Sequence, residues 1–585
     1  MALRLHLLKN GDWISARHPT TIVRFRRHLF DIGARGLAAL LDDRTQRCKA
    51  RGIVVSMRSF FGAVTVAATL AAAPSGAAAV FQAPTTRAPN IVVFLVDDLG
   101  WQDIQLPLHA ETTAFNRRYR TPNLVRLAAR GMTFTDAYAA APVCTPTRVA
   151  LLTGRSPAST HVTNWTQRRD QDTSAPFPLL LPPEWNMNGA SPDPRTPHAF
   201  SGPLLPKILR EAGYRTIHAG KAHWGAVGTP GADPHALGFD VNIGGSAAGQ
   251  PGSYLGRKNY SSGKPGEEFR DVPGLDAYHG TDTFLTEALT IEANRAVDEA
   301  VGRGHPFFLH FAQYAVHTPI ETDERFVARY REAGLPPREA AYASLIEGVD
   351  KSLGDVVENL RRLGVLENTI IIFGSDNGGL AAHSRAGDPH TQNAPLRSGK
   401  GAAYEGGIRV PLVIAWPGHT RPGSSNRAPT ITDDLFPTLL DVARVPNAAS
   451  YTRGTVGRDL VPALGGRATL PADRPLVWHY PHFWGTAGPG IEPFSAIRSG
   501  PWKLIFFYAG RRYELYDLKA DIGETTNLAE TSVAVAARLS RLLRSALSDA
   551  GAQMPIDPTT RQPVALPPVA GTRAASGERG QRGGD

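Results

Sequence analysis

Residues 90–100 read NIVVFLVDDLG, and residues 369–379 read TIIIFGSDNGG. In each stretch a run of apolar residues is followed by a pair of polar residues. Runs of this length predict strands that are buried on both faces, as in a parallel sheet. The carboxyl ends of parallel strands meet at one edge of the sheet, where open α/β folds bind ligands. The two stretches therefore predict an α/β fold that gathers oxygen donors at one sheet edge.

The alternation of strand and helix patterns extends over residues 88–445. Apolar runs predict further strands at 306–311 and 410–416. Apolar residues at helical spacing, several of them followed by a glycine, predict helices over 122–130, 149–152, 205–212 and 341–363. This alternation predicts one large α/β domain whose mostly parallel sheet is sandwiched by helices.

The pattern changes at about residue 446. Short aromatic strands are predicted at 476–480, 502–508 and 513–518, followed by a helix near 533–547. Residues 446–560 are therefore predicted to form a smaller α+β subdomain on an antiparallel sheet. Residues 561–585 are rich in proline, glycine and arginine, which predicts a disordered tail.

Composition excludes several classes of protein. The chain has 585 residues, of which 20% are charged and 42% hydrophobic, so wholesale disorder, collagen and coiled coils are excluded. The net charge of +10 is concentrated at the start of the chain, because residues 1–56 carry 11 Lys or Arg and only 4 Asp or Glu. The basic balance is therefore poor evidence for nucleic-acid binding by the folded part.

The start of the chain resembles a leader. Residues 57–79 combine a Met-Arg start, an apolar stretch and three alanines at 77–79, the layout of a secretory signal peptide. The alternative is a membrane anchor, but Pro74, Ser75 and Gly76 end the apolar run too early for a stable span. Residues 1–56 are interpreted as a non-native or disordered extension. We expect a periplasmic or secreted protein that uses the export machinery.

Cys144 lies in APVCTPTRVALLTGR, residues 141–155. Cleavage near Ala79 removes Cys48 and leaves Cys144 without a disulfide partner. One interpretation is a free thiol in a turn. A second is a thiolate nucleophile of low pKa at a helix N-terminus, with Arg148 one turn further on.

A third interpretation comes from a family. The pattern Cys-x-Pro-x-Arg followed by LLTGR resembles the signature of formylglycine-dependent sulfatases, arylsulfatase-type enzymes of the alkaline-phosphatase-like superfamily. The resemblance implies that Cys144 is converted to formylglycine by a maturation enzyme, and that the aldehyde hydrate is the nucleophile. Thr147 stands where serine is commonest in the family, a change that the modification signal should tolerate.

The same resemblance implies a metal site. It identifies Asp97, Asp98, Asp376 and Asn377, together with the modified Cys144, as metal ligands. Oxygen donors of this kind suit a hard divalent cation, calcium first and magnesium second. A single polar pair after a strand is usually only a turn, but here two pairs follow two buried strands.

Four further residues match family motifs. Lys221 and His223 lie in HAGKAHWG, His317 lies in QYAVHTP, and Lys400 lies in PLRSGKGAAYEGGIRVP. Taken singly, each lysine is more often a surface charge and each histidine a turn residue. The resemblance implies that Lys221, His317 and Lys400 hold the sulfate, that His223 assists proton transfer, and that Arg148 stabilises the modified residue.

Other positions have weaker support. Ser246 is a candidate substrate contact, and Ala222 and Trp224 replace the residues that usually flank His223. A second set is expected either to line the entrance and stack on a sugar or to pack between subdomains: His479, His482 and Trp484.

These motifs predict an exported, calcium-dependent sulfatase that hydrolyses a sulfate monoester on a small molecule or a carbohydrate. No nucleic-acid partner and no stable membrane span are expected. One alternative is a phosphoester or phosphonate ester hydrolase of the same superfamily, whose members usually carry Asp-His where this chain has Asp376-Asn377. The other is a non-catalytic glycan-binding protein on a sulfatase scaffold.

Overall fold

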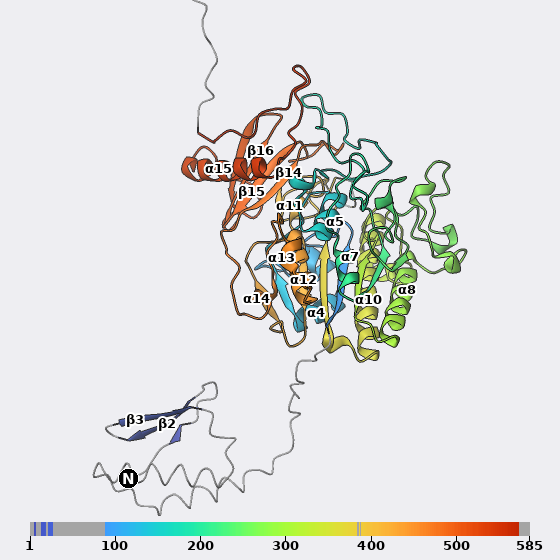
Figure 1. The fold of residues 1–585 in the computed structure, drawn as a ribbon, viewed down its shortest axis with the longest axis vertical. Helices are drawn as coiled ribbons and strands as arrows, with labels where there is room; N and C mark the ends of the chain where they lie inside the picture. Colours follow the sequence, from blue (N-terminus) through green and yellow to red (C-terminus); the bar gives the residue numbers. More distant parts are fainter. Residues whose placement is uncertain are drawn as a thin grey trace, which may run out of the picture. The chain divides into compact units, whose positions relative to one another are not determined.

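The computed structural model describes residues 88–382, 385 and 388–571, and the backbone of three short strands near the start of the chain (Figure 1). The chain divides into two compact units, residues 1–83 and 84–585. In the first unit, β1 (Leu5–His6), β2 (Trp13–His18) and β3 (Thr21–Arg26) form an antiparallel sheet that the sequence pattern did not predict. The predicted signal peptide, residues 57–79, lies outside the described residues.

The second unit is built on an eight-stranded sheet in the order β12-β5-β11-β10-β4-β9-β7-β8. The strands β10, β4, β9, β7 and β8 are parallel neighbours, whereas β11 runs antiparallel to both β10 and β5. The bounds of the eight strands, in chain order, are β4 (Asn90–Val96), β5 (Met132–Phe134), β7 (Arg215–Gly220), β8 (Val241–Ile243), β9 (Phe307–Ala312), β10 (Thr369–Ser375), β11 (Leu412–Ala415) and β12 (Ser424–Asn426).

Helices cover both faces of this sheet because its central strands are apolar on both sides. In β4, Val92, Phe94 and Val96 face one hydrophobic cluster, and Ile91 and Val93 face the other. The first cluster is closed by α4 (Pro122–Arg130), α8 (Leu285–Gly302) and α10 (Pro337–Arg362). The second is closed by α5 (Cys144–Thr153), α7 (Leu205–Glu211) and α12 (Leu435–Val442). The predicted α/β sandwich is confirmed.

Several strands were not predicted from the sequence pattern, or not in full, for identifiable reasons. The strands β5, β8 and β12 have three residues each, too few to show a period. The strand β7 has two buried polar residues, Thr216 and His218, which interrupt its apolar run. The strand predicted at 410–416 exists as β11, but its direction reverses within the sheet.

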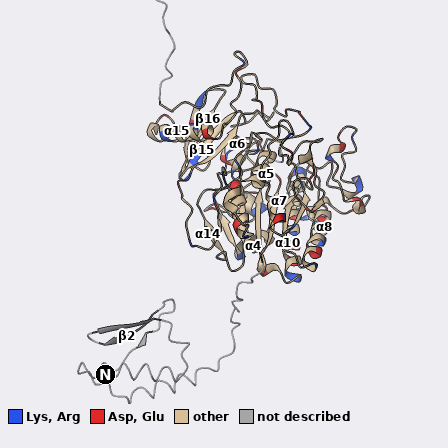
Figure 2. Ribbon diagram, viewed as in Figure 1, with Lys and Arg blue, Asp and Glu red and all other residues tan. Residues whose placement is uncertain are grey.

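Short elements complete the large domain. They are α3 (Ala114–Arg118), β6 (Ala137–Tyr138), α6 (Pro157–Thr160), α9 (Val327–Glu332), α11 (Glu405–Ile408), β13 (Thr430–Ile431), α13 (Ala448–Tyr451) and α14 (Val461–Leu464), with 3-10 turns at 230–232, 256–258, 268–270, 276–278, 366–368 and 432–434. None of the helices in the described part of the chain has both the length and the apolarity that crossing a membrane requires. Basic and acidic residues are interspersed along the ribbon of this unit (Figure 2).

The C-terminal part is an antiparallel sheet with one helix. The strands β14 (Leu476–Tyr480), β15 (Phe494–Ser499), β16 (Trp502–Phe507) and β17 (Arg512–Asp517) pair in chain order, and α15 (Val533–Asp549) packs on one face. This confirms the predicted α+β architecture, although β15 was not predicted as a strand.

Two boundaries differ from the prediction. Leu460, Val461 and Leu464 belong to a hydrophobic cluster of the large domain, so the antiparallel part begins nearer to residue 476 than to 446. Residues 561–571 were expected to be disordered, but Val564 and Leu566 are partly buried against the cluster around α15. Both differences arise because burial by distant elements is invisible in local composition.

Candidate active site

Four polar side chains meet where β4 and β10 end. The two strands are parallel neighbours with Val96 opposite Ser375, so Asp97, Asp98, Asp376 and Asn377 follow the paired ends directly. The backbone N–H of Asp98 donates to Asp376 Oδ1 at 3.2 Å, and Asn377 Nδ2 donates to Asp98 Oδ1 at 2.8 Å. All four are buried. The structure thus brings together the predicted oxygen ligands at the carboxyl edge of the sheet.

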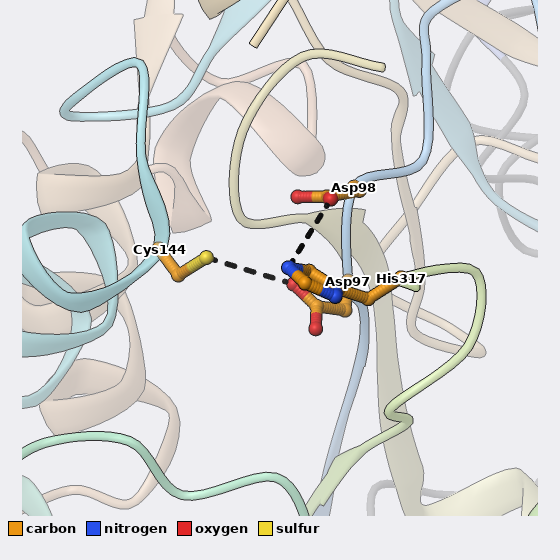
Figure 3. Close-up of side chains that lie close together, drawn as sticks. All are labelled: Asp97, Asp98, Cys144 and His317. Atoms are coloured by element: carbon orange, nitrogen blue, oxygen red, sulfur yellow. Dashed lines mark hydrogen bonds and ion pairs between the residues drawn. The ribbon is translucent and has the colours of Figure 1, made fainter. Parts of the chain in front are cut away.

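Cys144 is the first residue of α5 and lies beside these carboxylates. Its Sγ is 3.8 Å from Asp97 Oδ1 and 3.4 Å from Lys400 Nζ, and Figure 3 shows the thiol directed at Asp97. Burial raises the pKa of the Cys144 thiol to about 11, and the neighbouring Lys221 and Lys400 only partly oppose that rise. The thiolate is therefore disfavoured near neutral pH, against the interpretation as a low-pKa nucleophile.

Three buried cations pair with the three carboxylates. Lys221 Nζ lies 2.6 Å from Asp97, and Lys400 Nζ lies 2.7 Å from Asp98. Arg148 donates from Nε to Asp376 Oδ2 at 2.8 Å, and its Nη1 donates to the backbone oxygen of Lys221. These are the cations that the sequence motifs singled out.

The pKa values of the carboxyls depend on the balance between burial and these cations. Burial raises the pKa of Asp97 to about 8, although Lys221 opposes the rise. For Asp98 burial acts in the same direction, but Lys400, His317 and Lys221 outweigh it and lower the pKa. A third carboxyl, Asp376, is likewise held below its usual pKa by Arg148 and Lys221 against burial.

Two histidines face the same region, and both are neutral at pH 7. His317 Nδ1 bonds to the backbone oxygen of Thr318 at 2.9 Å, and Nε2 lies 3.6 Å from Asp98 Oδ2 (Figure 3). Burial and Lys400 lower the pKa of His317 to about 3. His223 Nε2 bonds to the carbonyl of Thr166 at 2.8 Å, and its pKa is lowered by burial and by Lys221.

The tautomer of His223 follows from that contact. A carbonyl oxygen only accepts, so Nε2 carries the proton and Nδ1 presents a lone pair. His223 Nδ1 is buried and has no hydrogen-bond partner among the described residues, while the residue itself lines the cavity. His223 Nδ1 is thus a free hydrogen-bond acceptor at the cavity.

Five residues of the site line a cavity of about 200 Å³, and we call them its buried end: Asp98, Cys144, His223, His317 and Lys400. The other site residues are not among the described residues that line it: Asp97, Arg148, Lys221, Asp376 and Asn377. The described wall of the cavity is made of Asp98, Val143, Cys144, Trp165, Thr166, Gln167, His223, Ala247, Gly249, Gln250, Phe269, Arg270, His317, Thr318, Leu380, Lys400 and Trp484. Sequence reasoning missed most of the outer wall, because its residues come from long connections without periodicity.

The positions with weaker support fall into two groups: Ser246, His479 and His482 are not among the described residues that line the cavity, and burial of the two histidines agrees with the packing alternative. The Oγ of Ser246 accepts a hydrogen bond from the backbone N–H of Ala248, and its carbonyl oxygen accepts one from the backbone N–H of His223. His479 and His482 are buried and hydrogen-bonded to Ser495 and to Thr163, respectively. Trp484 alone of its predicted set lines the cavity.

The donor set fits a hard divalent cation. Ligand atoms of Asp97 and Asp98 lie within 4.8 Å of one another and of the Cys144 thiol and the His317 imidazole, and in this group the two carboxylates are the hard donors. The buried Asn377 Oδ1 has no hydrogen-bond partner among the described residues, which is the state of an oxygen available to a cation. Carboxylate and amide oxygens are the ligands that calcium prefers.

Comparison with known proteins identifies the family of the chain. The family model "Sulfatase" matches residues 89–445, and "N-sulphoglucosamine sulphohydrolase, C-terminal" matches residues 399–551. N-acetylgalactosamine-6-sulfatase of Sus scrofa is 32% identical over 67% of this chain and 68% of its own length. Arylsulfatase A of Homo sapiens is 30% identical over 76% and 83%, respectively.

Solved structures agree. Ps i-CgsB in complex with k-i-k-neocarrahexaose superposes with a TM-score of 0.62 and 27% identity, covering 79% of this chain and 94% of that one. A family model that spans well over half of the chain, relatives of this identity and the shared fold lead to one conclusion. The chain belongs to the sulfatase family and is a sulfuric ester hydrolase.

Proposed function

We propose that this protein is an exported, calcium-dependent sulfatase that acts on a sulfated carbohydrate through a formylglycine made from Cys144. The observation that carries the proposal is the meeting of Cys144 with three buried carboxylate–cation pairs, one of which, Asp98 with Lys400, lines the same cavity as Cys144. A carbohydrate substrate is supported by relatives named N-acetylgalactosamine-6-sulfatase and by the neighbour solved with a neocarrahexaose. Export is supported by the signal-like residues 57–79.

The charges of the site suit sulfate transfer. With a divalent cation bound and all three carboxyl groups ionised, the carboxylates balance the three cationic side chains, and the metal leaves an excess of two positive charges. A sulfate monoester carries one negative charge and develops a second as the ester bond to sulfur breaks. Fixed positive charge in a buried site stabilises that developing charge without reorganisation.

Asp97, Asp98, Asp376 and Asn377 would hold the calcium ion, which would supply Lewis-acid chemistry to the sulfate. Formylglycine at position 144 would supply, as its hydrate, a hydroxyl nucleophile with a second hydroxyl on the same carbon. A serine at this position would instead leave a stable sulfate ester. The remaining residues bind, orient and move protons.

The lysines and His317 hold the sulfate. Lys400 reaches both Asp98 and position 144, so its ammonium is placed to hold an oxygen of the ester next to the nucleophile. Bound sulfate brings negative charge to His317, which favours the imidazolium and lets Nε2–H donate to a sulfate oxygen.

Two residues serve the nucleophile in different ways. The free lone pair of His223 Nδ1 accepts a hydrogen bond from a hydroxyl in the cavity and so assists proton transfer from it. Arg148 bonds to Asp376 and to the backbone of Lys221, so it orients a metal ligand and a sulfate-binding residue.

The test combines mass spectrometry with sulfate release. Protein made with a maturation enzyme should carry a residue 144 that is about 18 Da lighter than cysteine, because oxygen replaces sulfur and two hydrogens are lost. The same preparation should release sulfate from 4-nitrophenyl sulfate, and Cys144→Ala should fold but release none. Full activity with an unmodified Cys144 would refute the formylglycine mechanism.

A further inference from the structure

The residues that line the cavity outside its buried end form what we call the outer wall, and their side chains are mainly aromatic, amide and small. Its aromatic residues, Trp165, Phe269 and Trp484, offer apolar faces of the kind on which sugar rings pack. Gln167 and Gln250 offer amides to hydroxyl groups. Apart from the residues of the buried end, which include the carboxylate of Asp98, Arg270 is the ionisable side chain among the described residues that line the cavity.

Arg270 comes from the long connection between β8 and α8, drawn in green in Figure 1. Its backbone oxygen accepts from Gly252 N at 2.8 Å, next to the stretch that brings Gln250 to the cavity. Its guanidinium lies 5.3 Å from the centre of the Phe269 ring. Two contacts therefore fix the position of Arg270 on the wall.

The guanidinium retains unused donors. Arg270 Nη1 lies 3.1 Å from Glu267 Oε2, and the side chain has no other hydrogen bond among the described residues. The arginine side chain is 27% exposed, so a ligand in the cavity can reach it. A guanidinium presents five N–H donors in a planar fork that matches carboxylate and sulfate oxygens.

We propose that Arg270 binds a second anionic group of the substrate, a carboxylate or a second sulfate, while the first sulfate occupies the buried end. The substrate is then a saccharide with at least two negative charges, one cleaved and one recognised. This inference rests on the proposed function, because the buried end is taken to hold the ester that is hydrolysed.

Arg168 provides a control that tests whether Arg270 has only a structural role. Arg168 also stacks on Phe269, 4.9 Å from the ring centre, and its Nη2 donates to the Gly266 carbonyl at 2.7 Å. Arg168 is not among the described residues that line the cavity. It supports the same loop from outside, so its loss reports loop support without loss of a cavity charge.

The experiment measures binding by calorimetry to calcium-loaded Cys144→Ala protein, which cannot turn over. One pair of probes is a monosulfated disaccharide with a uronic acid and the same disaccharide with its carboxyl reduced to the alcohol. The other pair is glucosamine 2-N,6-O-disulfate and glucosamine 6-O-sulfate. The two pairs separate a carboxylate from a second sulfate as the recognised group.

The expected result is a preference of about tenfold or more for the doubly anionic member of at least one pair, the size of a lost charged hydrogen bond. Adding Arg270→Gln should abolish that preference, Arg270→Lys should retain part of it, and Arg168→Gln should leave it unchanged. Melting temperatures of all variants show whether they fold.

Equal binding of both members of both pairs overturns the proposal. So does a preference that survives Arg270→Gln, or one that Arg168→Gln removes to the same extent, since the arginine then acts only through the loop. Failure of the proposed function is a separate result: the modified wild-type protein then releases no sulfate from 4-nitrophenyl sulfate or from any probe.

Discussion

Cys144 is 3% exposed at the start of α5, and burial raises the pKa of its thiol to about 11. A buried neutral thiol is a poor nucleophile, which favours the proposed conversion of Cys144 to formylglycine. Neighbouring residues hold this position through specific hydrogen bonds. Thr147, one turn into α5, accepts from the N–H of Ala141 at 3.0 Å and donates to its carbonyl at 3.3 Å. It therefore holds the loop that leads into Cys144.

Thr147 gives a first prediction. Thr147→Ser keeps both hydrogen bonds and should retain modification of Cys144 and stability. Thr147→Val keeps the shape but leaves two buried backbone groups without their partner, at a cost of about 1–3 kcal/mol. Urea unfolding and peptide mass spectrometry check both variants. Equal stability of the two would show that the hydroxyl does not matter.

Asp433 gives a second prediction, on pH. Burial, followed by the charge of Asp434, raises its pKa to about 7, and neither carboxylate oxygen has a hydrogen-bond partner among the described residues. The folded state therefore binds a proton that the unfolded state has released above its ordinary pKa. Stability from this group is complete at pH below about 4 and is lost as pH rises to 7, with a slope of up to about 1.4 kcal/mol per pH unit.

Asp433→Asn removes that titration. The variant should lose less stability than the wild type between pH 5 and pH 8, as measured by urea unfolding at each pH. Arg474 and Asp434 face each other at 2.8 Å nearby and are unchanged in the variant, so they serve as a constant background. An identical pH dependence in the two proteins would contradict the assignment.

The connection between β8 and α8 contributes to the site in two ways: it carries Arg270, which lines the cavity, and it supports the loop of His317. Besides Arg270, it carries Tyr254, whose hydroxyl bonds to the backbone carbonyls of Tyr314 at 2.7 Å and His317 at 2.9 Å. Glu321, just beyond His317, accepts from Ser253 and pairs with Lys258 of the same connection. The connection thus holds the loop that presents His317.

Tyr254 is therefore predicted to be a positioning residue. Tyr254→Phe should lower kcat for sulfate release about tenfold or less while Cys144 is still modified. Tyr260→Phe is a matched control, because Tyr260 is equally buried and its hydroxyl bonds to the carbonyl of Thr283, away from His317. Each variant should lose about 1–3 kcal/mol of stability. Equal effects on kcat would reduce Tyr254 to a structural role.

At the scale of the whole molecule, three carboxyl groups and three cationic side chains are buried at one edge of the sheet. Burial of so many charged groups opposes folding. Taking ions out of water is expensive, and pairing repays the cost only with good geometry. A bound divalent cation adds attraction to the three carboxylates and uses the free oxygen of Asn377. Metal binding is therefore expected to be linked to global stability.

Chelation should lower both activity and melting temperature, and calcium should restore both better than zinc, because the proposed side-chain ligands are oxygen donors. A hundredfold excess over the dissociation constant adds about 2.7 kcal/mol. Asn377→Ala should reduce this calcium-dependent gain. Asn188→Ala, at a buried position bonded to Asp170, should lower stability equally with and without calcium. Better rescue by zinc would exclude the proposed site.

The division into two units leads to the last prediction. A chain that begins at Met57 should be exported and active, with a mature N-terminus near Val80, because the large unit begins at residue 84 and its first strand at Asn90. N-terminal sequencing of the exported protein checks this. Activity that requires residues before Met57 would contradict it.

Much of the fold and the centre of the site follow from local sequence. The strands β4 and β10 are readable because every residue in them is buried, which leaves a continuous apolar run. The helix α4 matches its predicted bounds because its apolar residues recur at helical spacing. Polar pairs after two such strands, and the Cys144 motif, indicate the site before any contact is known.

Other features were decided only by tertiary structure. The strand β7 was not predicted, because the polar His218 interrupts its apolar pattern. His218 can be buried there because it bonds to His310 of the neighbouring β9, 92 residues away. The reversal of β11, the inward burial of His479 and His482, and the place of Arg270 on the cavity wall depend on which distant segments meet. Local sequence records what a residue prefers, whereas packing of remote elements determines which side chains stand free to meet a substrate.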